Sequence, residues 1–388
     1  MLTNVSDKML LVGLIWYVTV TGGKSLLTLF ISISLLPHLF MVLKTGKLIN
    51  KMGALKLIIA SDLFRSILYS IMAIYIILCQ GKINVIVLVA STFLANIAAA
   101  LFNPALLTLP IKLVSGRGLQ KLTALLSSTI SIATIVGPMM AVYFYKVSGL
   151  YSLFLCATIS YGIAGLIELT IKIVKQCNDN IQPNQTSLSL IVKVKNYSLI
   201  VRMLVLFFLM NIFMGPLQLF MPLYAKVIFH GSVNTLSHLE VALGIGALLG
   251  MILMSAYTFK CRLWLRIILP YLLMAIAYFF FASSYSLFTA FIALSAMGFF
   301  LAIGNVSTLN LFQTYPAITD IPAIMAMVNF ISVAATPLAI FIAGNLLNED
   351  YLQEQAQLYA IAVFVLGLAI YFIPSLRQIK VIEASTHE

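Results

Sequence analysis

Charged side chains are scarce in this chain. Only 9% of its 388 residues are Asp, Glu, Lys or Arg, whereas 62% are hydrophobic and the mean hydropathy is +1.08. Soluble domains carry about 25% charged residues, because they must cover a core with polar surface. The composition therefore excludes a soluble globule and predicts an all-α polytopic membrane protein.

Residues that support covalent or metal chemistry are also few. The four cysteines form no CxxC pair and no Cys/His cluster, so neither a disulfide framework nor a metal site is indicated. No P-loop, catalytic triad or paired-carboxylate motif is present, and the glycine-rich run at 244–250 lies inside an apolar segment. We expect no catalytic residue, no metal and no cofactor, and hence no enzyme.

The net charge of +12 is distributed over short loops instead of gathering on one face or tail. This argues against a nucleic-acid partner and follows the positive-inside rule of membrane proteins. Most Lys and Arg residues fall in the even-numbered loops, against four on the other side: Lys24, Lys82, Lys146 and Lys226. Both termini are therefore predicted to be cytoplasmic, and no cleavable signal peptide is indicated.

Twelve apolar segments are long enough, or nearly so, to cross a bilayer core of about 30 Å. They run at about 9–22, 26–43, 56–79, 84–106, 123–145, 149–171, 201–225, 237–258, 263–283, 286–309, 322–345 and 356–375. A polar stretch separates two sets of six. We predict an N-terminal half at 1–173, a cytoplasmic linker at 174–200, a C-terminal half at 201–376 and a tail at 377–388.

The first apolar segment is short. Met9 to Val20 would span only about 18 Å as a helix, with Asp7 and Lys8 just before it. We expect that the chain begins within its first helix, through either a misplaced start codon or a real truncation.

Small residues recur every four positions in the fifth segment, at Thr129, Ala133, Gly137 and Ala141. Such a stripe lets another helix approach closely. Pro138 has no N–H for the carbonyl of Thr134, so a bend is expected there. The pattern suits a gate or hinge, although ordinary helix packing explains it as well.

The loop from Gly46 to Lys56 resembles the G-x-L-x-D-R-x-G-R-K loop of the major facilitator superfamily, with Gly46, Leu48, Gly53 and Lys56 in place. Gly137-Pro138 is similar to the core of the antiporter signature in that family. Asn50 replaces an Asp whose charge helps to latch the two halves in relatives, so the resemblance implies a weaker latch. The overall pattern is similar to the macrolide-efflux and enterobactin-exporter branch.

The resemblance implies a fold of two six-helix halves that alternate between inward-open and outward-open states. The chain departs from the family pattern in its second half. Relatives carry an Arg-Gly-Arg there, and this chain has Asp320-Ile321-Pro322-Ala323. We expect gating at Gly46, Asn50, Gly53, Gly137 and Pro138.

Ionisable residues inside the apolar segments are the candidates for coupling. Asp62 and Arg65 are three residues apart and share a helix face, as either a structural ion pair or a moving part of the cytoplasmic gate. Asp7 matches an Asp of the family's first helix and is our candidate for the coupling proton; the alternative is a helix-end charge beside Lys8. Glu168 and Glu240 are interpreted as boundary residues.

Neutral polar and aromatic side chains in the apolar segments are the expected lining of a substrate cavity, although interhelical hydrogen bonds would explain each of them. The substrate-binding candidates are Trp16, Tyr17, Asn96, Asn211, Gln218, Asn305 and Asn329.

These features predict a proton-coupled exporter of a bulky amphiphile, drug-like or siderophore-like. We expect it to act as a monomer in the inner membrane of a bacterium, with protons, lipid bilayer and a small molecule as its partners. An importer, for example of a metal-siderophore complex, and a transport-inactive scaffold or sensor remain alternatives.

Overall fold

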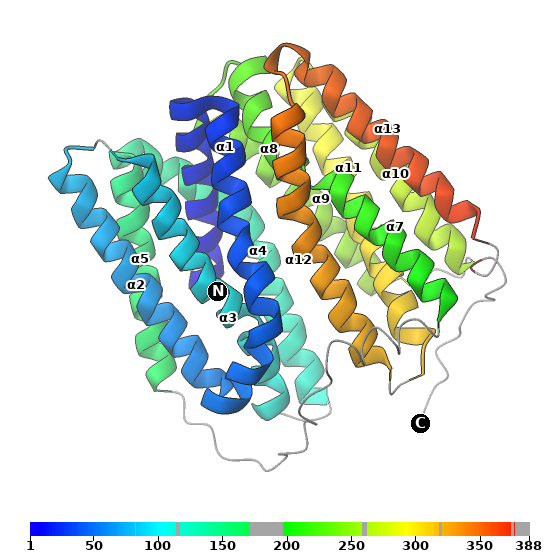
Figure 1. The fold of residues 1–388 in the computed structure, drawn as a ribbon, viewed down its shortest axis with the longest axis horizontal. Helices are drawn as coiled ribbons and strands as arrows, with labels where there is room; N and C mark the ends of the chain where they lie inside the picture. The colour runs from blue at the N-terminus through cyan, green and yellow to red at the C-terminus, as the bar shows by residue number, and fades with distance from the viewer. Residues whose placement is uncertain are drawn as a thin grey trace. The chain divides into compact units, whose positions relative to one another are not determined.

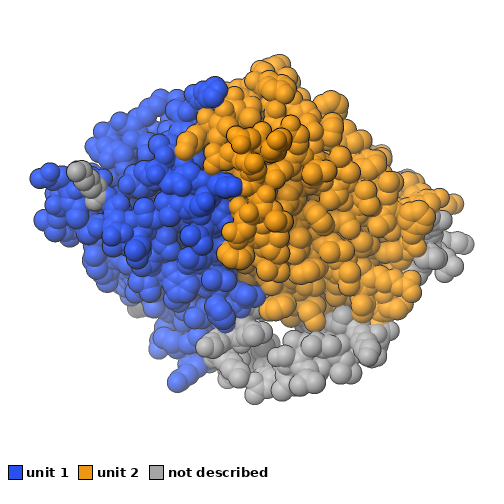
Figure 2. Space-filling view, turned by 45° about the horizontal axis from the view of Figure 1, so that its top comes forward, with its two compact units in different colours: residues 1–181, 230–241 blue, residues 182–229, 242–388 orange. Residues whose placement is uncertain are grey.

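The computed structural model describes residues 1–81, 83–113, 117–170, 197–257, 262–317, 320–373 and 376. Within its helices, the side chains at 42–44, 46–47, 50, 107–113, 117–125, 127–128 and 322–323 lie outside the description. Every regular element in the described ranges is helical, which confirms the all-α prediction. The chain forms two compact units, residues 1–181 with 230–241, and residues 182–229 with 242–388 (Figure 2).

The helices of the first unit are long and pack mainly side by side. They are α1 (Leu2–Met52), α2 (Ala54–Leu78), α3 (Val85–Leu113), α4 (Arg117–Ser148) and α5 (Leu150–Leu169). α1 packs on α3, α4 and α5, while α2 packs on α3 and α5. These contacts bring side chains from α1, α3 and α5 together around the buried Arg65 of α2.

α1 consists of two arms that meet at Gly23 (Figure 1). Gly23 has φ 62° and ψ −159°, a conformation that side-chain-bearing residues rarely adopt. The helix starts at Leu2, so the first arm covers residues 2–22, or about 30 Å at 1.5 Å per residue. This arm is longer than the apolar run from Met9 to Val20, because the helix also includes the polar residues that precede the run. That the chain begins within its first helix stays a prediction.

The second arm of α1 ends at Gly53, which also starts α2. Its φ of 85° and ψ of 145° reverse the chain without an intervening loop, and its N–H donates to the Ile49 carbonyl at 2.9 Å. This backbone conformation is essentially restricted to glycine. Ile49, Ala54, Leu57, Ile58, Phe102 and Ala105 form a small core that holds this turn against α3.

The second unit contains α7 (Ser198–Met214), α8 (Leu217–Leu223), the π-helix η1 (Tyr224–Ile228), α9 (Val233–Ala256), α10 (Leu263–Ala282), α11 (Leu287–Thr314), α12 (Ile321–Leu346), η2 (Glu349–Tyr351) and α13 (Leu352–Tyr371). The α9 residues 233–241 belong to the first unit. α10 packs on α11 and α13, and α7 packs on α12 and α13. The predicted segment 201–225 is interrupted where Gly215-Pro216 separates α7 from α8.

Eleven helices in the described ranges are long and apolar enough to span a membrane. The first of them, Leu2–Met41, includes both arms around Gly23, so the twelve predicted segments all have helical counterparts. The protein is a multi-pass membrane protein. Several helices run past their predicted ends, because polar and basic residues continue a helix beyond its apolar stretch.

Gly246 of the apolar run 244–250 and Gly298 of α11 allow the helices α9 and α11 to pack closely. A Cβ on Gly246 would collide with the Ser295 carbonyl, and one on Gly298 would collide with the Leu243 carbonyl. α9 and α11 thus cross with their backbones in contact, an arrangement that membrane helices reach through small residues.

Candidate functional site

The first unit is built around Arg65 of α2. Its side chain is the largest fully buried one in the described structure, with 0% of its surface exposed. A guanidinium keeps its charge in proteins, and a charge removed from water needs compensating partners. The contacts around Arg65 therefore define the electrostatic centre of this unit.

Two carboxylates compensate Arg65. Arg65 Nη2 donates to Asp62 Oδ1 at 2.5 Å, and Asp62 is also fully buried. Arg65 Nη1 lies 3.2 Å from both carboxylate oxygens of Asp7, whose side chain is 39% exposed. Arg65 thus joins a sealed carboxylate on its own helix to a solvent-accessible one on α1.

Tyr161 of α5 completes the network. Its hydroxyl donates a hydrogen bond to Asp7 Oδ1 and accepts one from Arg65 Nη1 at 3.3 Å. The Arg65 guanidinium carbon lies 4.3 Å from the centre of the Tyr161 ring and 4.8 Å from that of Phe102 on α3. Aromatic faces attract a guanidinium, so these two rings hold the cation in an apolar setting.

Glu168, on the same face of α5 as Tyr161, lies beside Asp62. Its Oε2 atom and the Asp62 Oδ2 atom are both buried without a hydrogen-bond partner among the described residues. Arg65 and the N-terminal amino group of the chain therefore act on three carboxyl groups, those of Asp7, Asp62 and Glu168. Three ionised carboxylates would still outnumber these two cations, which makes the cluster a candidate for proton binding.

Sequence reasoning found part of this site. The i, i+3 spacing predicted the pairing of Asp62 with Arg65, which the structure shows. It treated Asp7 as a separate group and Glu168 as a boundary residue, and it missed Tyr161 and Phe102. One signal was available: Tyr161, Gly165 and Glu168 share a face of α5, and Gly165 lets α2 approach, since a Cβ there would lie 2.9 Å from Leu63 Cδ2.

The small-residue stripe of α4 docks against the turn of α1 that carries Asp7. A Cβ on Gly137 would collide with Lys8 Cβ and would lie 3.1 Å from the Val5 carbonyl oxygen. Asn4 Nδ2 donates to Thr129 Oγ1 at 3.3 Å. The helix α4 continues through the buried Pro138. Close approach along the stripe is confirmed, whereas a bend at Pro138 and a gating role stay predictions.

The remaining gating candidates divide into two groups. Gly53 forms the turn between α1 and α2. Gly46 and Asn50 lie in the second arm of α1, and the surroundings of their side-chain positions are outside the description. Asp320 immediately precedes α12. The Tyr197 hydroxyl donates to Asp320 Oδ2 at 3.0 Å and accepts from the Ala317 N–H at 3.1 Å, which ties the start of α7 to that of α12.

A cavity of about 600 Å³ lies within the second unit, and two of the predicted substrate residues line it. Asn305 of α11 and Asn329 of α12 share it with Phe207, Leu309, Met325, Ala326, Val328 and Ser332. Tyr271 donates to Asn305 Oδ1 at 3.3 Å, which orients that amide. An apolar wall with a few amide and hydroxyl groups suits a bulky, weakly polar molecule.

The other predicted substrate residues are not brought into this cavity. In the first unit, Trp16 is 7% exposed, and Tyr17 and Asn96 are half-buried. In the second unit, Asn211 Nδ2 donates to the Phe207 carbonyl of its own helix at 2.7 Å, and Gln218 on α8 is exposed. Their part in binding stays a prediction.

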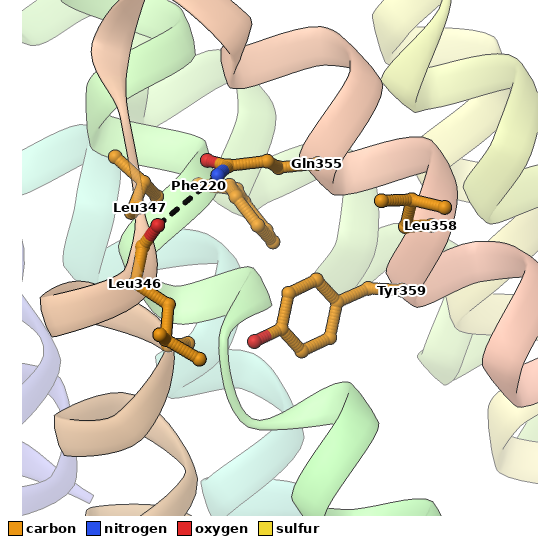
Figure 3. Close-up of a pocket in the computed structure, with 7 residues that line it drawn as sticks. Phe220, Leu346, Leu347, Gln355, Leu358 and Tyr359 are labelled. Carbon is orange, nitrogen blue, oxygen red and sulfur yellow. Dashed lines mark hydrogen bonds between the residues drawn. The ribbon is translucent and has the colours of Figure 1, made fainter.

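A smaller pocket of about 180 Å³ lies beside Phe220 and Tyr359, where the chain passes from α12 to α13 (Figure 3). Gln355 occupies its edge: its Nε2 donates to the Leu346 carbonyl at 3.1 Å, and its Oε1 accepts from the Asn348 N–H at 2.9 Å. The polar groups of Gln355 are thus used to hold the connection. We assign this pocket a structural role.

Comparison with known proteins agrees with this architecture. The structure resembles a mutant of the peptide transporter POT in complex with alafosfalin, with a TM-score of 0.76 and 10% identity over 97% of this chain and 93% of the other. It also resembles a mutant of the nucleoside transporter NupG, with a TM-score of 0.70 and 15% identity over 95% and 96% of the two chains. The POT family transporter PepTSo matches with a TM-score of 0.70 and 8% identity over 95% of each chain.

At these identities the three structures establish the fold alone. A search of curated protein sequences found no match. The family model described as Major Facilitator Superfamily matches residues 1–340, most of the chain. With two compact helical units and a buried charge cluster in the first, the chain belongs to the major facilitator superfamily and is a transporter rather than an enzyme.

Proposed function

We propose that this transporter couples proton movement to the export of a small amphiphilic molecule, drug-like or siderophore-like. The observation that carries the proposal is the position of Asp7: it is partly exposed, yet it is ion-paired with the fully buried Arg65. Water reaches one side of this carboxylate, and a buried cation binds its other side. The carboxylate can therefore either bind a proton or form the ion pair. Such a group supplies the titratable element that a proton-driven carrier needs.

The coupling step follows from the contacts. When Asp7 is ionised, Arg65 and Tyr161 bind it and fix the first arm of α1 against α2 and α5. Protonation removes the charge that Arg65 compensates, so the Asp7 to Arg65 pair weakens while the Asp62 to Arg65 pair remains. Gly137 of α4 packs on the same turn of α1, so a shift of that turn reaches α4 directly.

The cavity around Asn305 and Asn329 is the best candidate for a substrate subsite. Its lining offers amide and hydroxyl groups but no charged side chain. This favours a neutral, largely apolar substrate over a phosphate ester or a small ion. The loop charges favour cytoplasmic termini. Our proposal also includes a monomer in the inner membrane of a bacterium. The resemblance to the macrolide-efflux and enterobactin-exporter branch supports outward transport.

The test begins with an untargeted mass-spectrometric comparison of cells and medium, with the gene deleted and restored. A compound retained inside the deletion strain supports export and identifies the cargo. A compound left in the medium would instead establish import, and no difference under several growth conditions would favour a transport-inactive scaffold or sensor.

Coupling is then measured with the identified cargo in membrane vesicles under an imposed pH gradient. We expect Asp7→Asn to abolish gradient-driven accumulation while leaving cargo exchange across the vesicle membrane intact. Asp350→Asn, an exposed position on η2, is the matched control and should behave like the parent protein. Full gradient-driven transport by Asp7→Asn would rule Asp7 out as the coupling group.

A further inference from the structure

An apolar groove of about 340 Å³ lies in the second unit and shares no lining residue with the cavity of the proposed substrate site. It is formed by α9, α10 and α11, and its lining includes Leu253, Leu269, Leu273, Phe299 and Ile303. Leu265 and Leu269 beside it are 38% and 54% exposed. In a membrane protein such exposed leucines face lipid tails, so the groove opens toward the bilayer.

Arg266 is the single charged residue among the side chains that line this groove. It lies in the first turns of α10, which begins at Leu263. Its Nε atom is buried and has no hydrogen-bond partner in the described structure. No carboxylate of the described residues forms an ion pair with it, in contrast to Arg65, which has two. Arg266 is half-buried, so its permanent charge can pair with an anion from outside the described part of the chain.

A proline of α10 lies beside Arg266 in this groove. Pro270, which also lines the groove, has no N–H for the carbonyl of Arg266, four residues earlier. That missing bond and the proline ring loosen the turn between the two residues.

The charge pattern indicates which leaflet the groove faces. Arg262 immediately precedes α10 and Arg266 lies in its first turns, next to a basic loop that the positive-inside rule assigns to the cytoplasmic side. Anionic phospholipids attract such residues at that surface, and basic pockets between membrane helices bind their headgroups. The apolar lining distinguishes a lipid from a free anion, since a soluble phosphate gains nothing from Leu269 or Phe299.

We propose that the groove between α9, α10 and α11 binds an anionic phospholipid, with its phosphate on the Arg266 guanidinium and one acyl chain against Leu269, Phe299 and Ile303. A planar guanidinium can bind a phosphate through two parallel hydrogen bonds. The site is independent of the proton and substrate sites, so it stands whether or not the transporter is an exporter.

The test uses the purified full-length protein in detergent, to which phosphatidylglycerol or phosphatidylcholine is added before native mass spectrometry. The parent protein should retain phosphatidylglycerol in preference to phosphatidylcholine. Arg266→Gln should reduce phosphatidylglycerol binding by about 10-fold and leave phosphatidylcholine unchanged. Leu269→Trp, which fills the groove, should weaken binding of both lipids.

Arg262→Gln is the matched control, because Arg262 is an exposed arginine at the start of the same helix. It should retain phosphatidylglycerol like the parent protein, and Arg266→Lys should keep part of the preference. Equal loss in Arg262→Gln and Arg266→Gln would show diffuse attraction and overturn the proposal. Unchanged binding in Arg266→Gln, or displacement of the lipid by millimolar inorganic phosphate, would overturn it too. Size-exclusion profiles of each variant in phosphatidylcholine report whether it is folded.

Discussion

Arg65 Nη1 lies 3.2 Å from both carboxylate oxygens of Asp7, although the two residues are 58 positions apart. The Nη2 atom of the same guanidinium donates to Asp62 Oδ1. This shared use makes Asp7 and Asp62 competitors for one cation, so a change of charge on the exposed carboxylate is felt by the buried one. The predictions below test this arrangement and its surroundings.

Removing the arginine should be strongly destabilising. Arg65→Gln leaves Asp62 fully buried without its counter-charge, and breaking a buried pair in this way costs about 3–5 kcal/mol. Thermal unfolding in detergent, followed by fluorescence, measures the loss. The double variant Arg65→Gln with Asp62→Asn should recover much of it, because the orphaned charge is gone. Equal stability of the single and double variants would contradict the pairing.

Loss of the Tyr161 hydroxyl should impair transport more than folding. Tyr161→Phe keeps the ring against Arg65 but removes the hydrogen bonds to Asp7 and Arg65. We expect a loss of about 1 kcal/mol in stability and a clear fall in gradient-driven transport. Tyr143→Phe, at a side chain that is 65% exposed, is the matched control. A Tyr161→Phe protein that transports normally would show that the hydroxyl has no part in coupling.

A methyl group at Gly137 should separate α4 from α1. Gly137→Ala places a Cβ against Lys8 and the Val5 carbonyl, where backbone must move to make room. Overpacking of this kind costs typically about 1–3 kcal/mol. Gly162→Ala is the comparison, since its nearest neighbour is the Ser66 hydroxyl at 3.2 Å, which can rotate away. Unfolding temperatures should fall distinctly further for Gly137→Ala, and identical values would exclude the close packing.

Replacing Asn329 in the second-unit cavity should weaken substrate binding and leave the stability of the protein unchanged. Asn329→Leu removes an exposed amide from the lining, so the KM for the cargo should rise roughly 3- to 10-fold, with the unfolding temperature unchanged. Asn345→Leu lies on the same helix, outside the cavity, where its amide bonds to the Phe341 carbonyl. That variant should keep the parent KM. A KM increase of the same size in both would remove the cavity from the binding site.

Sequence patterns determined the membrane class, the helical segments and the family of this protein. Each of these depends on local regularities: the length of apolar runs, the distribution of Lys and Arg, and short loop motifs such as Gly46 to Lys56. Asp62 with Arg65, and Thr129 with Gly137, could be placed on common helix faces for the same reason, because helix geometry relates residues a few positions apart.

Only the tertiary structure decided which of these faces meet. Asp7, Arg65 and Tyr161 come from three helices, and no spacing along the chain relates them. The arrangement depends on the turns at Gly23 and Gly53 and on close packing at Gly137 and Gly165, which set how near the helices approach. Burial then determines the partners of Arg65. Because water does not reach its guanidinium, the carboxylates and aromatic rings packed around it must compensate its charge.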